Sequence, residues 1–104
     1  MEILSLTTTV ASLEDAERLA RALLDRRLAA CVQLEEGVQS HYRWKGESCA
    51  DAEVRLTIKS VPARLAALQD FMAEQHPYEL PQLLWQTMEA SPAYAEWARQ
   101  QVED

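Results

Sequence analysis

Glycine, cysteine and histidine are scarce in this chain of 104 residues: each occurs only twice. With two glycines there is no Gly-rich loop to bind phosphate through backbone N–H groups, which excludes the common nucleotide-binding motifs. Cys31 and Cys49 form no Cys-x-x-Cys pair, which excludes a zinc ribbon and a thioredoxin-type motif. No apolar run approaches the roughly 18 residues of a membrane span.

Basic residues are also few, with ten Lys and Arg against seventeen Asp and Glu, and the net charge is −7. Such a surface repels phosphate backbones and anionic lipid headgroups, so we expect neither nucleic acid nor a membrane as a partner. No basic segment precedes an apolar one after Met1, so no export signal is expected and the predicted location is the cytoplasm. The length favours a single domain over residues 1–104.

Hydrophobic periodicity predicts the order β-α-β-β-α-β-α, with Ser12 and Asp15 at the spacing of a helix cap. The predicted ranges are strand 2–10, helix 12–27, strands 30–44 and 53–59, helix 62–75, strand 83–88 and a last helix from Ser91-Pro92. The first six elements match the split βαβ, ferredoxin-like arrangement. This is an α+β sandwich with two helices on one face of a four-stranded antiparallel sheet, and the C-terminal helix is an addition. The other face of the sheet needs a cover or lies in solvent.

The two central strands predict a long hairpin that turns near Gly46. A turn there places Cys49 opposite Arg43 and Cys31 opposite Val61. At about 3.3 Å per residue the two thiols lie about 40 Å apart along the hairpin, which excludes a disulfide within one chain.

The hairpin is longer than an ordinary strand pair, and Gly37 is a candidate bulge within it. Tyr42 and Trp44 share one face of this ribbon, where two aromatic side chains project beyond a small core. The ribbon either packs against another subunit or curls back on its own sheet. We favour burial against another subunit.

Short blocks of residues along nearly the whole chain add a second line of evidence. They are Leu28-Ala29-Ala30-Cys31-Val32, Gly37-Val38, Ser40, Tyr42, Trp44-x-Gly46, Glu53, Lys59, His76-Pro77-Tyr78-Glu79-x-Pro81 and Pro92-Ala93-Tyr94-x-x-Trp97. In these blocks the sequence resembles the CutA family, the divalent-cation tolerance proteins. The resemblance implies a ferredoxin-like homotrimer, similar in architecture to the PII signalling proteins. It also implies a role in tolerance to copper and other divalent metals, without an established reaction.

The copper ligands of bacterial relatives are a Cys in the first strand and a His-His pair before Pro-Tyr. These positions correspond here to Thr8, Gln75 and His76, and among the three only His76 is a good ligand for Cu(II). The resemblance therefore implies a metal site at His76, completed by Glu79 or by a carboxylate of another subunit. The structural alternative for His76 is a helix end at which the ring nitrogens bond to nearby carbonyls, and this alternative is the one we favour.

Tyr78 and Glu79 lie in a loop stiffened by prolines, which predicts either a shaped connector or one wall of a cleft between subunits. Lys59 is a second candidate for such a cleft, or a partner of Glu53. We interpret Cys31 as a small buried side chain and Cys49 as exposed. His41 is expected in solvent, and the carboxylates Glu47, Asp51 and Glu53 are interpreted as solvated charge rather than a site for a hard cation.

The sequence thus predicts a cytoplasmic, homotrimeric binding protein of the CutA type for divalent metal, with Cu(II) or another divalent cation as its ion. No nucleophile stands beside a visible base, so an enzyme is not predicted. The alternative function is a PII-like sensor that binds a small metabolite at the subunit interface and signals to a protein partner.

Overall fold

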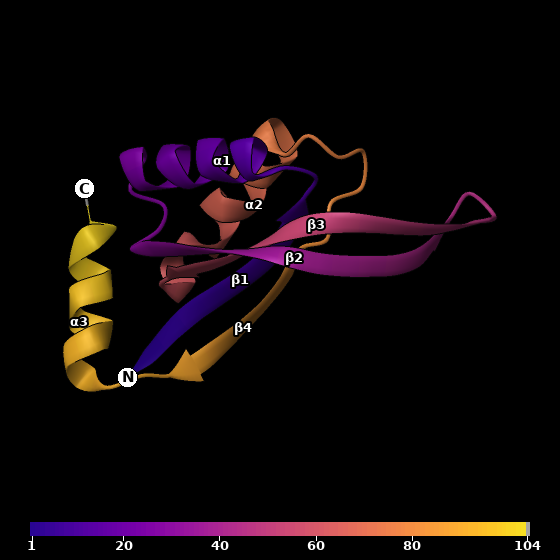
Figure 1. The fold of residues 1–104 in the computed structure, drawn as a ribbon. Coiled ribbons are helices and arrows are strands. Elements are labelled where there is room, and N and C mark those ends of the chain that lie inside the picture. Colours follow the sequence, from indigo (N-terminus) through magenta and orange to yellow (C-terminus); the bar gives the residue numbers. More distant parts are fainter. Residues whose placement is uncertain (104) are drawn as a thin grey trace.

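The computed structural model describes residues 1–103 of the chain. The elements are β1 (Glu2–Val10), α1 (Leu13–Asp25), β2 (Cys31–Trp44), β3 (Glu47–Ser60), a 3₁₀ turn (Pro62–Arg64), α2 (Leu65–Gln75), β4 (Leu84–Glu89) and α3 (Pro92–Gln101). The strands form one antiparallel sheet in the order β2-β3-β1-β4 (Figure 1). This order confirms the predicted ferredoxin-like α+β fold. No helix of residues 1–103 is long and apolar enough to cross a membrane.

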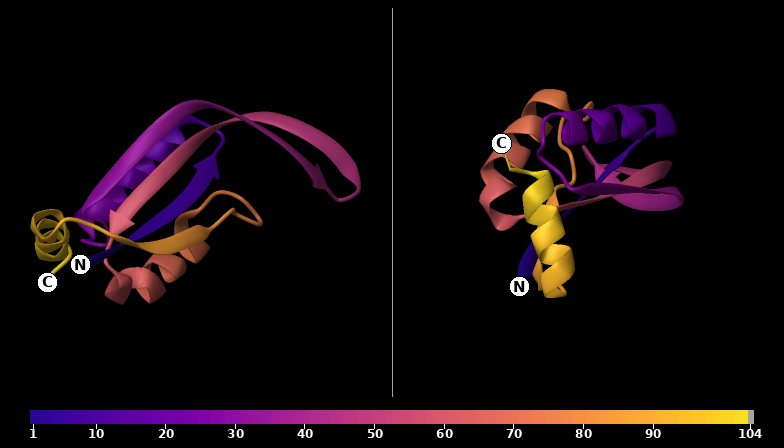
Figure 2. Two further views of the ribbon diagram at one scale, coloured as in Figure 1. Left: turned by 90° about the horizontal axis from the view of Figure 1, so that it is seen from below. Right: turned by 90° about the vertical axis from the view of Figure 1, so that its left-hand side faces the viewer.

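Helices α1 and α2 cover one face of the sheet and enclose the main core (Figures 1 and 2). The apolar stripe of α1 and the inward side chains of α2 pack on alternate residues of β1 and β3, as helical and strand periods require. The buried residues of this core include Leu19, Leu23, Leu68, Phe71, Met72, Leu4, Leu6, Leu56 and Ile58.

The opposite face of the sheet is covered only at one end, by α3 (Figure 2). There Ala95 and Ala98 pack on Ile3 and Ala30 in a small second cluster. The rest of this open face carries two rows of cross-strand neighbours that run from β4 through β1 and β3 to β2. One row is Leu84, Thr7, Thr57 and Gln33, and the other is Gln86, Ser5, Lys59 and Cys31. The predicted need for a cover is therefore met at the α3 end alone.

The element boundaries differ from the sequence prediction by one to three residues in most cases. Helix α1 ends at Asp25, because Arg27 has a φ of 55° and so leaves the helical region. The first turn of the predicted helix 62–75 is 3₁₀, and β4 runs one residue later than predicted. The return strand is the exception: it begins at Glu47, right after the turn, not at Glu53.

Strands β2 and β3 extend beyond the end of β1 as a two-stranded ribbon (Figure 1). We call residues 38–53 the ribbon. A two-residue turn closes it at Lys45-Gly46, where both residues have positive φ, as in a type I′ turn. The ribbon lengthens the molecule, whose principal extents are 45 × 24 × 22 Å.

The pairing of β2 with β3 corrects the predicted register. Cys49 lies opposite Tyr42 rather than Arg43, and Cys31 lies opposite Lys59 rather than Val61. The turn is centred between Lys45 and Gly46, half a residue earlier than predicted, which moves every cross-strand partner by one residue. A bulge between Glu35 and Val38 moves the partners of the residues before it, such as Cys31, by one residue more. Gly37 has a φ of 80° within this bulge, as predicted from its glycine. Both cysteines are free thiols.

Candidate functional site

His76 lies at the C-terminal end of α2, and its side chain is buried against the end of β1. The ring Nδ1 accepts a hydrogen bond from the backbone N–H of Tyr78 at 3.1 Å. A neutral ring then carries its proton on Nε2, which lies 3.1 Å from the Thr9 carbonyl oxygen and 3.0 Å from the Thr8 hydroxyl. Both ring nitrogens therefore have partners within the protein.

The environment of His76 keeps its ring uncharged. Burial lowers the pKa of His76 below the ordinary value for histidine, and nearby Arg18 lowers it further. The hydrogen bond to the Thr9 carbonyl acts in the opposite direction but is the smaller effect. At neutral pH this imidazole is a structural hydrogen-bonding group with one donor and one acceptor in use.

Two of the three positions expected to hold a metal, Thr8 and His76, are in contact. The third does not join them, because the side chain of Gln75 donates to Glu74 at 2.9 Å. No group of three or more His, Cys, Asp or Glu side chains able to hold a metal ion gathers anywhere in residues 1–103. A hydroxyl, an amide and one occupied imidazole do not make a formed site for a transition metal.

The loop after His76 contacts the ribbon through Tyr78 and Glu79. The Tyr78 hydroxyl donates to the Glu53 carboxylate at 2.7 Å, and the Tyr78 ring packs 5.0 Å from the His76 ring. Burial raises the pKa of Tyr78, and the hydrogen bond to Glu53 raises it further. Glu79 lies 3.8 Å from the Lys45 ammonium at the ribbon turn. The loop thus holds the ribbon at its base and at its tip.

The candidate interface residues Tyr42 and Trp44 remain largely exposed, at 45% and 36%. The Tyr42 hydroxyl donates to Asp51 on the neighbouring strand, and this hydrogen bond raises the pKa of Tyr42 to about 12. The Lys45 ammonium lies 5.6 Å from the centre of the Trp44 ring. Neither aromatic ring enters the core of its own chain.

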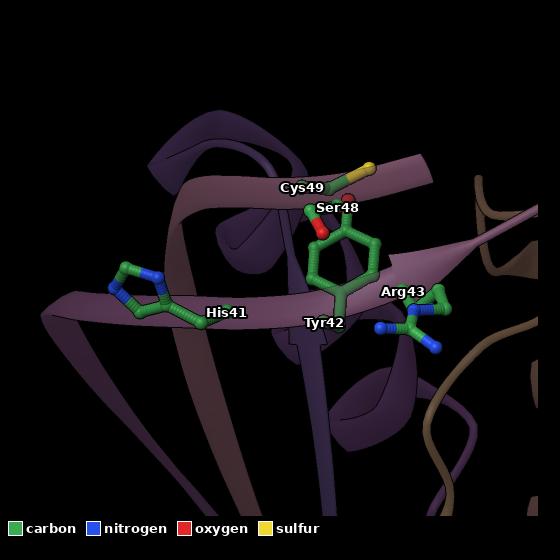
Figure 3. A pocket seen from close by; sticks show the side chains of 5 residues that line it. All are labelled: His41, Tyr42, Arg43, Ser48 and Cys49. Carbon is green, nitrogen blue, oxygen red and sulfur yellow. The ribbon is translucent and has the colours of Figure 1, made fainter. Parts of the chain in front are cut away.

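A shallow hollow near the ribbon tip is lined by His41, Tyr42, Arg43, Ser48 and Cys49 (Figure 3). Figure 3 shows the Tyr42 ring lying beside Cys49, with His41 further along β2. Cys49 is half-buried rather than exposed, and its thiol donates to the Glu47 carbonyl at 3.8 Å. His41 is exposed, as predicted.

Lys59 lies on the open face of the sheet, where its ammonium donates to the Gln33 side chain at 3.4 Å. The alternative pairing of Lys59 with Glu53 is wrong, because Glu53 lies further along β3 and accepts from Tyr78. Cys31, opposite Lys59, is half-buried rather than fully packed.

Sequence reasoning missed the two tyrosine–carboxylate hydrogen bonds, Tyr42 to Asp51 and Tyr78 to Glu53. It interpreted both carboxylates as solvated. Alternation along β3 places Asp51 and Glu53 on one face, but which tyrosine reaches them depends on the bend of the ribbon and the path of the loop. No pattern in the sequence reports either.

A family model, related sequences and solved structures all show similarity of this chain to the same family. A family model described as CutA1 divalent ion tolerance protein matches residues 4–101. The divalent-cation tolerance protein CutA of Thermus thermophilus is 37% identical over 93 residues, which cover 88% of this chain and 90% of that protein. The structure of CutA from Synechococcus elongatus is similar with a TM-score of 0.92 at 38% identity, covering 98% of this chain and 91% of that one.

Human protein CutA is 39% identical over 89 residues, 85% of this chain. The chain spans about half the length of this relative and of its mouse counterpart.

Proposed function

Because the chain belongs to the CutA1 divalent ion tolerance protein family, we propose that it is a cytoplasmic, homotrimeric binding protein for divalent metal ions, Cu(II) in the first place. The observation that carries the proposal is the contact between Thr8 and His76, with 3.0 Å between the hydroxyl oxygen and Nε2. It brings two of the three expected ligand positions to one point although they are far apart in sequence.

His76 is the proposed metal ligand, since imidazole nitrogen suits copper and zinc better than a hydroxyl or an amide does. The other ligands of the metal ion have to come from residues outside the three expected positions. Glu79 is the nearest candidate in sequence, and its carboxylate is exposed apart from the contact with Lys45. A carboxylate of a second copy of the chain is the other candidate, and a trimer supplies it by symmetry.

Three features support the proposed trimer. The open face of the sheet lacks a cover away from α3, every residue of β4 is exposed, and Tyr42 and Trp44 project from the ribbon. A two-stranded ribbon is marginally stable alone, so contact with another subunit would stabilise it. Tyr42, Tyr78, Trp44, Lys59 and Glu79 are the side chains we place at or near the interfaces.

Binding without catalysis is supported by the family, which is described by tolerance to divalent ions and not by a reaction. The cytoplasmic location is supported by Cys31 and Cys49, which are free thiols and suit a reducing compartment.

The test is a calorimetric titration of chelator-treated protein with Cu(II), with Zn(II) in parallel. His76→Gln is expected to abolish the tightest binding step, whereas the matched variant His41→Gln, at the other histidine, leaves it intact. Equal binding by wild type and His76→Gln would contradict the proposed site. Light scattering on the same samples measures the proposed mass of about 35 kDa, three times the 11.8 kDa of one chain.

A further inference from the structure

Ser5 lies on β1, an interior strand, within the part of the open face that α3 leaves uncovered. It lies opposite Lys59 of β3 on one side and opposite Gln86 of β4 on the other. Directly opposite residues of an antiparallel pair have Cβ atoms about 4.5–5.5 Å apart, so the three side chains are immediate neighbours. We call Ser5, Lys59 and Gln86 the polar row.

The hydroxyl of Ser5 is available to a ligand. Only 6% of this residue is exposed, and its hydroxyl has no hydrogen-bond partner among residues 1–103. In the same part of the chain, no fully enclosed side-chain oxygen or nitrogen lacks a partner. The Ser5 hydroxyl oxygen is therefore not enclosed. It reaches the surface of the open face although the rest of the residue is buried.

The Lys59 ammonium beside this hydroxyl lacks a counter-charge. Lys59 is half-buried, and no carboxylate of residues 1–103 forms an ion pair with it. Its partner is the Gln33 amide oxygen at 3.4 Å, which is longer than an ordinary N–H···O hydrogen bond of about 2.7–3.2 Å. The three N–H donors of the ammonium are thus hardly used, and a partly desolvated charge gains from a bound anion.

The surroundings of the polar row also favour an anion. The chain has seventeen Asp and Glu, but neither of the two rows across the open face contains one. Glu35, further along β2, is already paired with Arg55 at 3.1 Å. The groups that remain are an ammonium, hydroxyls and amides, all of which can donate hydrogen bonds. Such a set repels a cation and suits the oxygens of an oxyanion.

We propose that the polar row binds a small oxyanion, of which phosphate and sulfate are the simplest forms. The Lys59 ammonium and the Ser5 hydroxyl donate to its oxygens, and the Gln86 amide donates from β4. The site shares no residue with the positions expected to hold a metal ion, so it does not depend on metal binding. In the proposed trimer a second copy covers this face, and the anion then neutralises Lys59 between the two chains.

The same face provides a matched control. Thr9 is 5% exposed, its hydroxyl also has no partner among residues 1–103, and alternation along β1 places it on the face of Ser5. Thr9 lies opposite Arg55, as Ser5 lies opposite Lys59. Arg55, however, is neutralised by Glu35. Both places combine a hydroxyl with a cation, but of the two cations only Lys59 lacks a counter-charge.

The test is an NMR titration of isotopically labelled protein with inorganic phosphate at constant ionic strength, with chloride as the ionic control. Phosphate is expected to give saturable shifts of the backbone amides of Ser5, Lys59 and Gln86, and chloride none. Lys59→Gln is expected to weaken phosphate binding roughly tenfold, and Ser5→Ala severalfold, as for the loss of a charged and a neutral hydrogen bond. Arg55→Gln and Thr9→Val are expected to leave the affinity unchanged.

Two outcomes overturn the proposal. If phosphate gives no saturable shift at the polar row, the face holds no anion site. In that case, a lower mass of Lys59→Gln in light scattering would identify a carboxylate of a second copy as the counter-charge. If Arg55→Gln weakens binding as much as Lys59→Gln does, phosphate responds to the overall charge of the face. Neither outcome affects the Cu(II) titration of His76→Gln, which tests the proposed function separately.

Discussion

His76 is held uncharged between β1 and the loop that follows α2, and its protonation should therefore cost stability. Because burial lowers its pKa in the folded protein, the unfolded chain takes up the proton first as the pH falls. The contribution is complete above about pH 6.5, the ordinary pKa of histidine, and is lost as the pH falls toward the lowered pKa of the folded state.

Chemical denaturation of wild type between pH 7 and pH 5 should show the free energy of unfolding falling through this group by at most about 1.4 kcal/mol per pH unit. His76→Gln should have a shallower dependence over the same range. His41→Gln, which removes the other, exposed histidine, is the matched control. Parallel curves for wild type and His76→Gln would show that His76 does not titrate differently in the folded state.

Ser60 is a second single residue with a defined role. It is fully buried at the end of β3, and its hydroxyl donates to the Leu28 carbonyl at 2.7 Å. Ser60→Ala leaves that carbonyl without this partner and should lower the free energy of unfolding by about 1–3 kcal/mol. Urea denaturation measures the loss, and Ser48→Ala at an exposed position should change stability little.

At the scale of elements, the bulge at Gly37 lies in β2 where the ribbon begins. Gly37 has a φ of 80°, and apart from its two chain neighbours no residue lies within 4 Å of the position that a Cβ would take. Gly37→Ala should therefore cost about 1–2 kcal/mol through backbone strain alone, without steric crowding. Thermal unfolding of this variant beside Gln39→Ala, whose backbone is ordinary, separates strain from the loss of a ribbon side chain.

The elements were predictable because each carries its own period. The stripe of α1, the alternation at the start of β2 and the prolines at Pro62 and Pro92 predicted the type and order of these elements and their approximate bounds. The register was not predictable, because it depends on the centre of the turn and on the residue that the bulge at Gly37 adds, and both show only once the strands pair. Hydrophobic periodicity describes one helix or strand at a time and does not determine the register between two paired strands.

The candidate site likewise has one part that the sequence predicted and one part that it did not. That His76 follows a helix and precedes a stiff loop was readable from His76-Pro77, and its neighbourhood with Thr8 followed from the family resemblance. The bond from Tyr78 to Glu53 was not readable, since it joins a loop to a ribbon whose bend depends on the whole fold. The metal, the trimer and the alternative of a metabolite sensor all remain predictions.

At the scale of the whole molecule, the two faces of the sheet are unequal. Helices α1 and α2 close one face over the main core, while the other face is closed by α3 at one end only. The edge strand β4 places Leu84 and Met88 on that open face, with Leu84 59% exposed. An uncovered row that ends in apolar side chains is the surface a second copy of the chain would cover in the proposed trimer.

Leu84→Lys should therefore reduce the mass in solution from three chains to one, because a buried, unpaired ammonium at each interface is costly. Leu24→Lys is the matched control: Leu24 is also an exposed leucine, at 46%, but it lies on α1, on the opposite side of the sheet. Light scattering measures the mass, and circular dichroism checks that each chain keeps its fold. A trimer that survives Leu84→Lys but not Leu24→Lys would place the interface on the helical side and contradict the arrangement argued from the open face.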